Sequence, residues 1–462
     1  MFKRILVANR SEIALRIIRC CREMDIETVL IYSEADKISL PVQLATYPIC
    51  IGPAKAKDSY LNQDSIIDIA LRTECEAIHP GYGFLSENGE FARKCEENGL
   101  IFIGPSADII ERMGDKQSAR ELMMANNIPV VPGSKGLIES HEEARKMADE
   151  IGYPVLIKAS AGGGGRGMRK AYNAEEVEKA FTEARAEAIS AFDNGDMYME
   201  KLILQPRHIE FQILGDKFGN IIHLGERDCS IQRRNQKMLE EAPSKALTKE
   251  LRKKMGDVAV KAAEAAGYYS AGTVEFVLDK DNNFYFIEMN TRIQVEHPVT
   301  EMVSGVDILR EQIRIAAGLK LSLSKDEVVL KGHAIECRIN AENPLENFRP
   351  TPGKIDFLHL PAGNGVRVET AVYSGYEISP YYDSMVAKII VHARTRLEAI
   401  RKMRCALEEL MIDGIVTNEQ FQYIMMYHPK YIKGNYDTSF LENHMDELIE
   451  WSKNSGIEVE DE

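Results

Sequence analysis

The stretch 286–298 constrains the fold most, because its side chains alternate between polar and apolar types. In an extended strand, successive side chains point to opposite faces, so one face would be polar and the other apolar. An ordinary solvated face would favour Lys, Ser and Thr. Here the polar positions hold carboxylates, amides and a guanidinium: Glu288, Asn290, Arg292, Gln294 and Glu296. The pattern predicts a half-buried strand that serves a functional site, with a merely solvated strand as the alternative.

The strand that precedes this stretch adds a third acid. Residues 272–279 and 284–288 flank a polar loop and predict a β-hairpin, in which Glu275 lies opposite Glu288. Two facing carboxylates repel each other unless a cation lies between them. Mg²⁺ prefers oxygen ligands, and Asn290 could supply one more. We therefore expect a metal site formed by these three side chains, although a surface hairpin with acids near lysines remains possible.

A glycine run predicts a second binding element. The strand 155–158 ends at Lys158, and glycines occupy positions 162–165 and 167. Backbone N–H groups of such a loop can close over phosphates, with the lysine as a nearby cation. The chain has no GxxxxGK[ST] sequence, so this is not a Walker loop. A flexible connector is the alternative, but loop and acids together describe an ATP site.

The remaining polar residues of the stretch imply a second substrate. Arg292 can hold a small oxyanion through two parallel hydrogen bonds. Glu296, further along the same face, could act as a base. Arg338 on a later predicted strand is another candidate cation. For Arg338, spacing alone favours an ordinary salt bridge to a neighbouring glutamate. Because Pro298 cannot donate to a strand ladder, we expect strand geometry to loosen into a loop before His297.

The order of predicted elements gives a multidomain protein of α/β and α+β class. Strands alternate with helices up to residue 114, which predicts a Rossmann-like parallel sheet, although GxGxxG is missing. Ser11 or Asn9 could cap the first helix, and the charged stretch 226–241 lacks periodicity and is predicted as a loop. The predicted units are 1–114, 115–330 with a smaller part at about 131–203, 331–446, and an acidic, disordered tail at 447–462.

Bulk properties exclude several classes. A chain of 462 residues should form about two to four domains. The net charge of −15 argues against a nucleic-acid partner. No apolar run reaches membrane-spanning length and no secretory signal is present, so we expect no membrane association. Eight cysteines without a CxxC pair suit a reducing cytoplasm, and ten histidines without HxxxH make a zinc site an improbable feature.

Several segments, spread over residues 1 to about 445, resemble the corresponding segments of one enzyme family. The chain resembles the biotin carboxylase subunit of bacterial acetyl-CoA carboxylase, in the ATP-grasp superfamily. The string 288–297, which reads EMNTRIQVEH, is the most specific part of the resemblance. The other matching segments are Ala8-Asn9-Arg10, 32–36, 79–85, 158–167, 226–230 and 381–385.

The resemblance implies a Rossmann-like N-terminal domain, an ATP-grasp domain with a mobile lid at about 131–203, and a C-terminal biotin carboxylase domain. It also implies the site residues. ATP would be bound by Lys116, Lys158, Gly164, Gly165, Glu200, Lys201, Leu202, Ile203, His208 and Asn235. Mg²⁺ or Mn²⁺ would be held by Glu275, Glu288 and Asn290. Bicarbonate would be bound by Lys237, Arg292, Gln294 and Val295, with Glu296 as its base. Biotin would meet Arg338 and Tyr82.

The implied reaction is the first half-reaction of acetyl-CoA carboxylase, in fatty-acid synthesis. Bicarbonate and ATP give carboxyphosphate, which breaks down to CO₂ and phosphate, and N1′ of biotin captures the CO₂. No Ala-Met-Lys-Met biotinylation site is present, so biotin would arrive on a biotin carboxyl carrier protein, with a separate carboxyltransferase. The alternatives are the same subunit in a pyruvate or other acyl-CoA carboxylase, an ATP-grasp carboxylate–amine ligase, or a regulatory nucleotide-binding subunit.

The resemblance also implies a homodimer, through positions that correspond to Arg19, Glu23 and Arg367. Three positions depart from the family pattern. Ser11 stands where glycine is usual, Asn235 stands where some members have histidine, and Asn364 replaces a usual aromatic residue. Because serine is a good helix cap, we expect the change at Ser11 to cost little.

Overall fold

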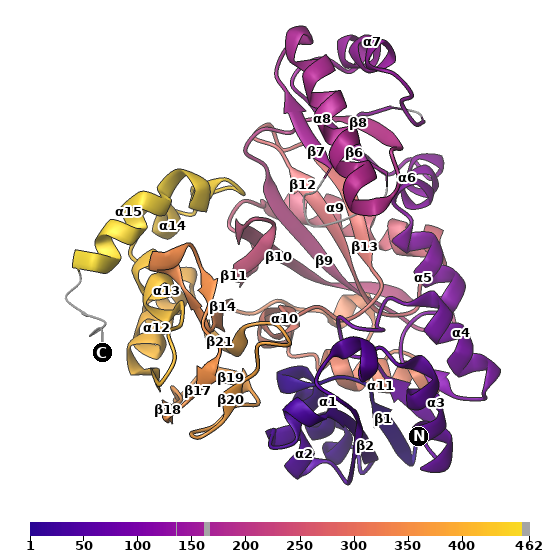
Figure 1. The fold of residues 1–462 in the computed structure, drawn as a ribbon, viewed down its shortest axis with the longest axis vertical. Helices are drawn as coiled ribbons and strands as arrows, with labels where there is room; N and C mark the ends of the chain where they lie inside the picture. The colour runs from indigo at the N-terminus through magenta and orange to yellow at the C-terminus, as the bar shows by residue number, and fades with distance from the viewer. Residues whose placement is uncertain (135, 161–166, 455–462) are drawn as a thin grey trace.

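The computed structural model of the protein describes residues 1–134, 136–160 and 167–454, drawn in Figure 1. Its first unit is a parallel five-stranded sheet in the order β3-β2-β1-β4-β5. The strands are β1 (Arg4–Val7), β2 (Glu27–Ser33), β3 (Tyr47–Gly52), β4 (Ala77–His79) and β5 (Ile101–Phe102). The helices are α1 (Ser11–Glu23), α2 (Leu40–Leu44), α3 (Gln63–Arg72), α4 (Gly89–Glu97) and α5 (Ala107–Gly114). The predicted Rossmann-like start is thus confirmed.

The central sheet is antiparallel and has eight strands in the order β13-β12-β9-β10-β11-β14-β21-β19. The strands are β9 (Arg207–Gly215), β10 (Ile221–Arg233), β11 (Gln236–Ala242), β12 (Ser270–Leu278), β13 (Phe284–Asn290), β14 (His333–Asn340), β19 (Val366–Thr370) and β21 (Met385–Ala393). Between residues 115 and 330, the helices outside the smaller unit described next are α6 (Lys116–Ala125), α9 (Lys249–Ala266), α10 (His297–Ser304) and α11 (Ile308–Ala316). This sheet continues across residue 330, so the predicted third unit shares its sheet with the second.

A smaller unit stands apart at the top of Figure 1. Its antiparallel three-stranded sheet has the order β7-β6-β8. The elements are β6 (Val155–Ala159), β7 (Met168–Ala171), β8 (Met197–Lys201), α7 (His141–Ile151) and α8 (Ala174–Phe192). It has its own core, in which Phe181 and Met199 of α8 and β8 are buried with Val155 and Ile157 of β6. These residues fall within the segment predicted as a lid.

The chain ends in helices that cover one side of the central sheet, coloured orange to yellow in Figure 1. They are α12 (Arg396–Glu409), α13 (Glu419–Met425), α14 (Pro429–Lys433) and α15 (Phe440–Asn454). Short strands precede or connect them: β15 (Glu342–Asn343), β16 (Arg349–Pro350), β17 (Gly353–Lys354), β18 (Phe357–His359), β20 (Glu377–Ile378) and β22 (Met411–Asp413). No helix among the described residues is both long and apolar enough to span a bilayer.

The predicted start of the acidic tail at 447 is wrong for residues 447–454, which belong to α15. Leu448 is buried in the C-terminal core, and Trp451 packs against it, so apolar burial holds the helix. Glu447 Oε2 also lies 3.4 Å from His428 Nε2 and 3.1 Å from His444 Nδ1. His428 Nδ1 accepts the Lys430 N–H, so Nε2 carries the ring hydrogen of His428 and donates it to Glu447. Glu447, His428 and His444 therefore form a hydrogen-bonded cluster. Residues 455–462 lie outside the described residues.

The prediction of a loop over 226–241 is wrong. Residues 221–233 and 236–242 form the paired strands β10 and β11. Their two-residue turn is Arg234-Asn235, and both residues have positive φ, 50° and 64°, as tight hairpins prefer. Periodicity failed because the charged side chains on these strands are buried and paired, including Glu226, Arg227 and Asp228.

The prediction that Ser11 or Asn9 caps the first helix is also wrong. Arg10 is the N-cap residue and makes no side-chain cap bond, while Asn9 donates to Pro80 O and Tyr82 O, 2.7 Å each. Ser11 has φ 55°, the left-handed region in which glycine is unstrained. The family's glycine is therefore explained by backbone geometry, and the serine bears a conformational cost.

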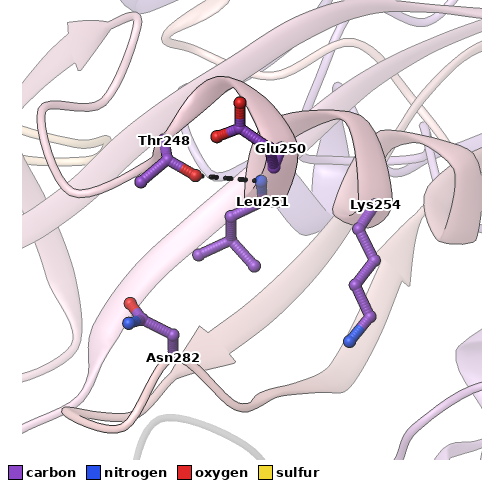
Figure 2. A pocket seen from close by; sticks show the side chains of 5 residues that line it. All are labelled: Thr248, Glu250, Leu251, Lys254 and Asn282. Atoms are coloured by element: carbon purple, nitrogen blue, oxygen red, sulfur yellow. Dashed lines mark hydrogen bonds between the residues drawn. The ribbon is translucent and has the colours of Figure 1, made fainter.

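We predict that Ser11→Ala leaves the melting temperature unchanged, because no cap bond is lost. Thr248→Ala is the matched control: Thr248 Oγ1 accepts the Leu251 N–H at 3.1 Å and begins α9 (Figure 2). Losing this cap should cost about 1 kcal/mol and lower the midpoint by about 1 °C in a chain of this length. Ser11→Gly should raise the midpoint, and scanning calorimetry compares the three variants. A loss at Ser11→Ala as large as that at Thr248→Ala would contradict this account.

Candidate active site

Four charged side chains form one row across the central sheet. Strand register places Arg227 of β10 opposite Glu210 of β9, Glu210 opposite Glu275 of β12, and Glu275 opposite Glu288 of β13. Directly opposed residues share a face of a sheet, so one cation and three carboxylates line up on one side. The predicted opposition of Glu275 and Glu288 is confirmed.

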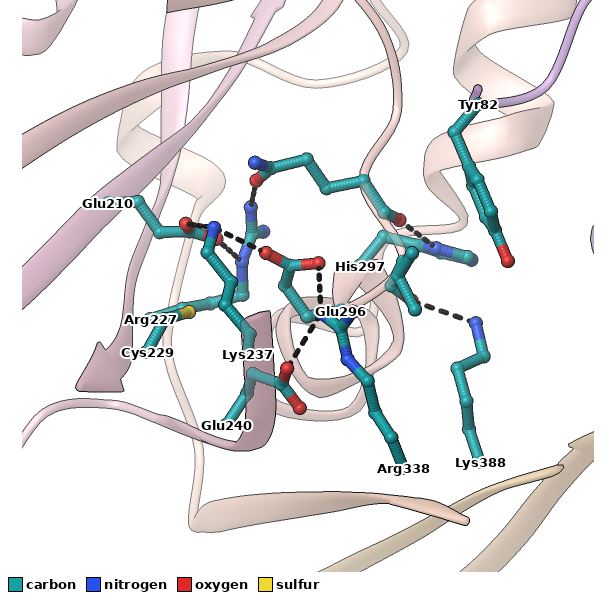
Figure 3. Close-up of polar contacts among 12 residues, drawn as sticks. Tyr82, Glu210, Arg227, Cys229, Lys237, Glu240, Glu296, His297, Arg338 and Lys388 are labelled. Atoms are coloured by element: carbon teal, nitrogen blue, oxygen red, sulfur yellow. Dashed lines mark hydrogen bonds and ion pairs between the residues drawn. The ribbon is translucent and has the colours of Figure 1, made fainter. Parts of the chain in front are cut away.

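Lys237 of β11 joins this row to the stretch 291–296 (Figure 3). Its Nζ donates to Glu210 Oε2 at 2.5 Å, Glu275 Oε1 at 2.9 Å and Glu296 Oε1 at 2.8 Å. Burial alone would lower the pKa of Lys237, but the three carboxylates outweigh it and raise that pKa well above its ordinary value. The ammonium therefore stays charged at the centre of the site.

Glu296 lies between two cations. Its Oε1 accepts from Lys237, and its Oε2 accepts from Arg338 Nη2 at 2.9 Å. Arg338 Nη2 also lies 2.7 Å from Glu240 Oε1, so two acids share that guanidinium. Burial raises the pKa of Glu296, but Lys237 and Arg338 outweigh burial and the pKa falls. The carboxylate is thus ionised, which a proton acceptor requires.

The rest of the stretch 286–298 is a loop and a helix start whose side chains contact Glu87 and Glu275. Strand β13 ends at Asn290, and α10 begins at His297 with Pro298 in its first turn, so the extended geometry loosens earlier than the alternation suggested. Arg292 donates to Glu87 Oε2 at 2.8 Å and Asn290 Oδ1 at 3.0 Å. Gln294 Nε2 donates to Glu275 Oε1 at 2.7 Å. The loop keeps the polar groups together where a strand would have separated them.

The three predicted metal ligands lie together but differ in how many hydrogen bonds their side chains make. Glu275 accepts hydrogen bonds from Lys237, Asn290 and Gln294, and its pKa falls well below its ordinary value because the cations outweigh burial. The side chain of Glu288 makes no hydrogen bond or ion pair within the described ranges, and burial and Glu275 raise its pKa. Two carboxylates and an amide oxygen are the donors that a hard divalent cation prefers. The residues present therefore fit Mg²⁺ or Mn²⁺.

His208 faces this metal-ligand cluster. Its Nε2 lies 2.9 Å from Glu275 Oε2. Burial would lower the pKa of His208, but Glu275 outweighs it and the pKa rises to about 9. The imidazolium therefore stabilises the ionised Glu275.

The predicted nucleotide residues come from several elements. Lys158 of β6 pairs with Glu200 of β8, and Lys116 is exposed in the first turn of α6. The Nζ of Lys201 donates to the carbonyls of Gly152 and Tyr153, and its backbone N–H donates to Pro132 O at 2.7 Å. Leu202 N–H donates to Pro154 O at 2.9 Å, and Ile203 follows it. Asn235 is exposed in the β10–β11 turn, and Gly164 and Gly165 lie outside the described residues.

Tyr82 is connected to the site through two buried side chains, Glu12 and Lys388; Figure 3 draws Tyr82 and Lys388. The Tyr82 hydroxyl donates to Glu12 Oε1. Glu12 Oε1 lies 3.2 Å from Lys388 Nζ, which donates to Val295 O at 2.8 Å. Glu12 and Lys388 therefore link Tyr82 to the loop that carries Val295.

Sequence reasoning gave no role to several residues that the structure brings to this site. They are Glu12, Glu87, Glu210, Arg227, Glu240 and Lys388. One signal was visible: His208, Glu210 and Gln212 alternate with apolar residues along β9, which marks a polar face. The others depend on contacts between distant segments. A cavity of about 280 Å³ beside α9, lined by Thr248, Glu250, Leu251, Lys254 and Asn282, shares no residue with the site (Figure 2).

Three family models match most of the chain. Residues 1–110 match the N-terminal domain of biotin carboxylase, and residues 336–443 match the biotin carboxylase C-terminal domain. Residues 115–324 match the ATP-binding domain of the carbamoyl-phosphate synthase L chain. The match to an ATP-binding domain covers the whole row of charged residues.

Individual relatives cover nearly the full length of both chains. Biotin carboxylase 1 of Bacillus subtilis (strain 168) is 56% identical over 445 residues, which is 96% of this chain and 99% of that one. The Campylobacter jejuni biotin carboxylase–β,γ-ATP complex has a TM-score of 0.93 at 51% identity, over 96% and 99% of the two chains. The biotin carboxylase domain dimer of Hydrogenobacter thermophilus 2-oxoglutarate carboxylase, solved with MgADP, ADP and bicarbonate, has a TM-score of 0.91 at 53% identity, over 97% and 99%. Identity at this level over the whole chain, on the same fold, shows that the protein is an ATP-dependent enzyme of the biotin carboxylase family.

Proposed function

We propose that the chain carboxylates biotin on a separate carrier protein, with ATP and bicarbonate as substrates. The observation that carries this proposal is the position of Lys237, which contacts the metal-side acid Glu275 and the candidate base Glu296 through one ammonium. A single buried cation that bridges both acids suits a reaction joining an oxyanion to a phosphoryl group. The relative solved with MgADP and bicarbonate supports this choice of substrates.

On the nucleotide side, Lys116, Lys158 and the backbone of Gly164 and Gly165 bind the ATP phosphates, and Glu200, the 201–203 backbone, His208 and Asn235 bind the rest of the nucleotide. Glu275, Glu288 and Asn290 would hold Mg²⁺ or Mn²⁺, which neutralises charge on the transferring phosphoryl group when bound. Lys158 is now paired with Glu200, so a phosphate must compete with that carboxylate. Because Lys158 and Glu200 both belong to the segment 131–203, which we propose as the lid, this competition makes nucleotide binding depend on that segment.

On the bicarbonate side, Lys237, Arg292, Gln294 and the backbone of Val295 bind the oxyanion. An anion that takes over Lys237 removes a cation from Glu296, and this raises the pKa of Glu296 and strengthens it as a base. Glu296 then takes the hydroxyl proton, and the freed oxygen attacks the γ-phosphorus of ATP. Carboxyphosphate and ADP result.

Biotin occupies the side of Arg338 and Tyr82. Carboxyphosphate breaks into CO₂ and phosphate, the phosphate takes the N1′ proton of biotin, and N1′ attacks CO₂. Arg338 stabilises the negative oxygen of the biotin enolate, for which it must loosen its contacts with Glu240 and Glu296. Closure of the lid would keep water from the labile intermediate.

The partners follow from the half-reaction. We propose a homodimer that works with a biotin carboxyl carrier protein and a carboxyltransferase, in the cytoplasm. Arg19 is half-exposed near Glu369, and Glu23 lies 3.5 Å from Arg310, so both remain available at the surface. Arg367 is paired with Glu301 and Glu369. Acetyl-CoA carboxylase is the proposed complex, with 2-oxoglutarate or pyruvate carboxylase as alternatives because the acceptor does not meet this chain.

A coupled assay tests the function directly. ATP cleavage should require bicarbonate and biotin together, and labelled bicarbonate should appear in carboxybiotin. Measurement of ADP release with each substrate omitted in turn checks the requirement. Cleavage that is indifferent to both bicarbonate and biotin would reject the proposal, and transfer to an amine would favour a carboxylate–amine ligase.

Glu288→Lys should reduce turnover by about 100-fold or more, because an ammonium replaces a metal ligand. Glu264→Lys, which makes the same change at an exposed position on α9, should behave as wild type. Turnover measured against Mg²⁺ or Mn²⁺ concentration compares the two variants. Near-normal activity in Glu288→Lys would remove Glu288 from the metal site.

Arg338→Gln should separate the two halves of the reaction. ADP formation should persist within about threefold, whereas carboxybiotin formation should fall by about 100-fold, the cost of one lost oxyanion partner. Arg349→Gln, at an exposed arginine with a single surface ion pair, serves as the control. Unchanged carboxybiotin formation in Arg338→Gln would reject the role given to Arg338.

A further inference from the structure

Arg227 is the largest fully buried side chain among the described residues. Its side chain is 0% exposed, so it cannot touch a substrate without rearrangement. A guanidinium has five N–H donors, and five contacts are present. They are Glu210 Oε1 at 2.5 Å, Gln212 Oε1 at 2.8 Å, Thr300 Oγ1 at 2.9 Å, Thr273 Oγ1 at 3.1 Å and Gln294 Oε1 at 2.7 Å. Every donor is therefore used, which fixes the guanidinium in one orientation.

The contact with Gln294 determines how that amide faces the site. Arg227 can only donate, so it must meet the amide oxygen, and the amide nitrogen must point away. That nitrogen donates to Glu275 Oε1 at 2.7 Å, which can only accept. With both ends held, the second N–H of Gln294 has a fixed direction and needs no reorientation to meet an anion.

The contact with Glu210 reaches the same place by a second path. Arg227 Nε holds Oε1 of Glu210, while Oε2 accepts from Lys237 Nζ at 2.5 Å. Arg227 Nη1 also donates to Thr300 Oγ1 of α10, the helix that begins just after Glu296. Arg227 thus bonds to one proposed bicarbonate contact, Gln294, to the partner of another, Lys237, and to the helix that follows the proposed base.

We propose that Arg227 is a positioning residue for the bicarbonate subsite: it sets the amide of Gln294 and, through Glu210, the ammonium of Lys237. The inference rests on the proposed function. It predicts selectivity between substrates, because the nucleotide lysines Lys116 and Lys158 make no contact with Arg227 among the contacts of the described residues. A residue that only stabilised the fold would affect both substrates alike.

The test is steady-state kinetics of Arg227→Lys. Lysine keeps the charge but cannot reach five acceptors, so KM for bicarbonate should rise about tenfold or more, with KM for ATP within about twofold. The matched control is Arg252→Lys: Arg252 pairs with the buried carboxylate of Glu226, also on β10, and makes no contact with Gln294. It should leave both constants unchanged. Equal changes in the two KM values for Arg227→Lys would overturn the proposal.

A double-mutant cycle identifies the route of the effect. If Arg227 acts largely through Gln294, Arg227→Lys should add little to the bicarbonate KM once Gln294 is Ala. Full additivity would overturn the Gln294 path.

A second variant tests the proposal if Arg227→Lys fails to fold. Thr300→Val removes a single partner of Arg227 and should raise KM for bicarbonate about two- to fivefold. An unchanged KM for bicarbonate in Thr300→Val would equally count against the proposal. A wild-type enzyme that cleaves ATP without any need for bicarbonate would instead reject the proposed function itself.

Discussion

Lys237 is surrounded by more negative charge than it can neutralise, and the arrangement of the site depends on this imbalance. Glu210, Glu275 and Glu296 all bond to one ammonium. Burying carboxylates is costly unless cations and hydrogen bonds compensate. Arg227, His208 and Arg338 supply that compensation from the outside of the cluster. The cluster is therefore held together by cations that its own strands and the neighbouring β14 supply.

The same contacts place the two proposed substrates side by side. Glu275 belongs to the metal side and Gln294 to the bicarbonate side, yet they are hydrogen-bonded to each other. Asn290 and Arg292 are joined in the same way. These hydrogen bonds bring the proposed metal and bicarbonate subsites into direct contact, so any coupling between the two substrates needs no distant pathway.

Much of the fold could be predicted from local pattern. The alternation of strands and helices up to residue 114 predicted the parallel sheet of the first unit. The hairpin that opposes Glu275 to Glu288 followed from two strand patterns and the polar loop between them. Residues 226–241 failed for the opposite reason: their buried faces are charged, and pairing with residues far along the chain replaces apolar burial. Arg227, whose partners lie 15 to 73 residues away, has no local signature at all.

The unbroken central sheet has a mechanical consequence. Lys237 and Arg338 lie on β11 and β14, which are paired neighbours, although they belong to units that the chain order would separate. A hydrogen-bonded ladder resists shear, so the spacing between Lys237, proposed for bicarbonate, and Arg338, proposed for biotin, cannot follow a hinge between those units. The three-stranded sheet of β6, β7 and β8 is not part of that ladder. Movement of the proposed lid would therefore leave the distance between these two cations unchanged.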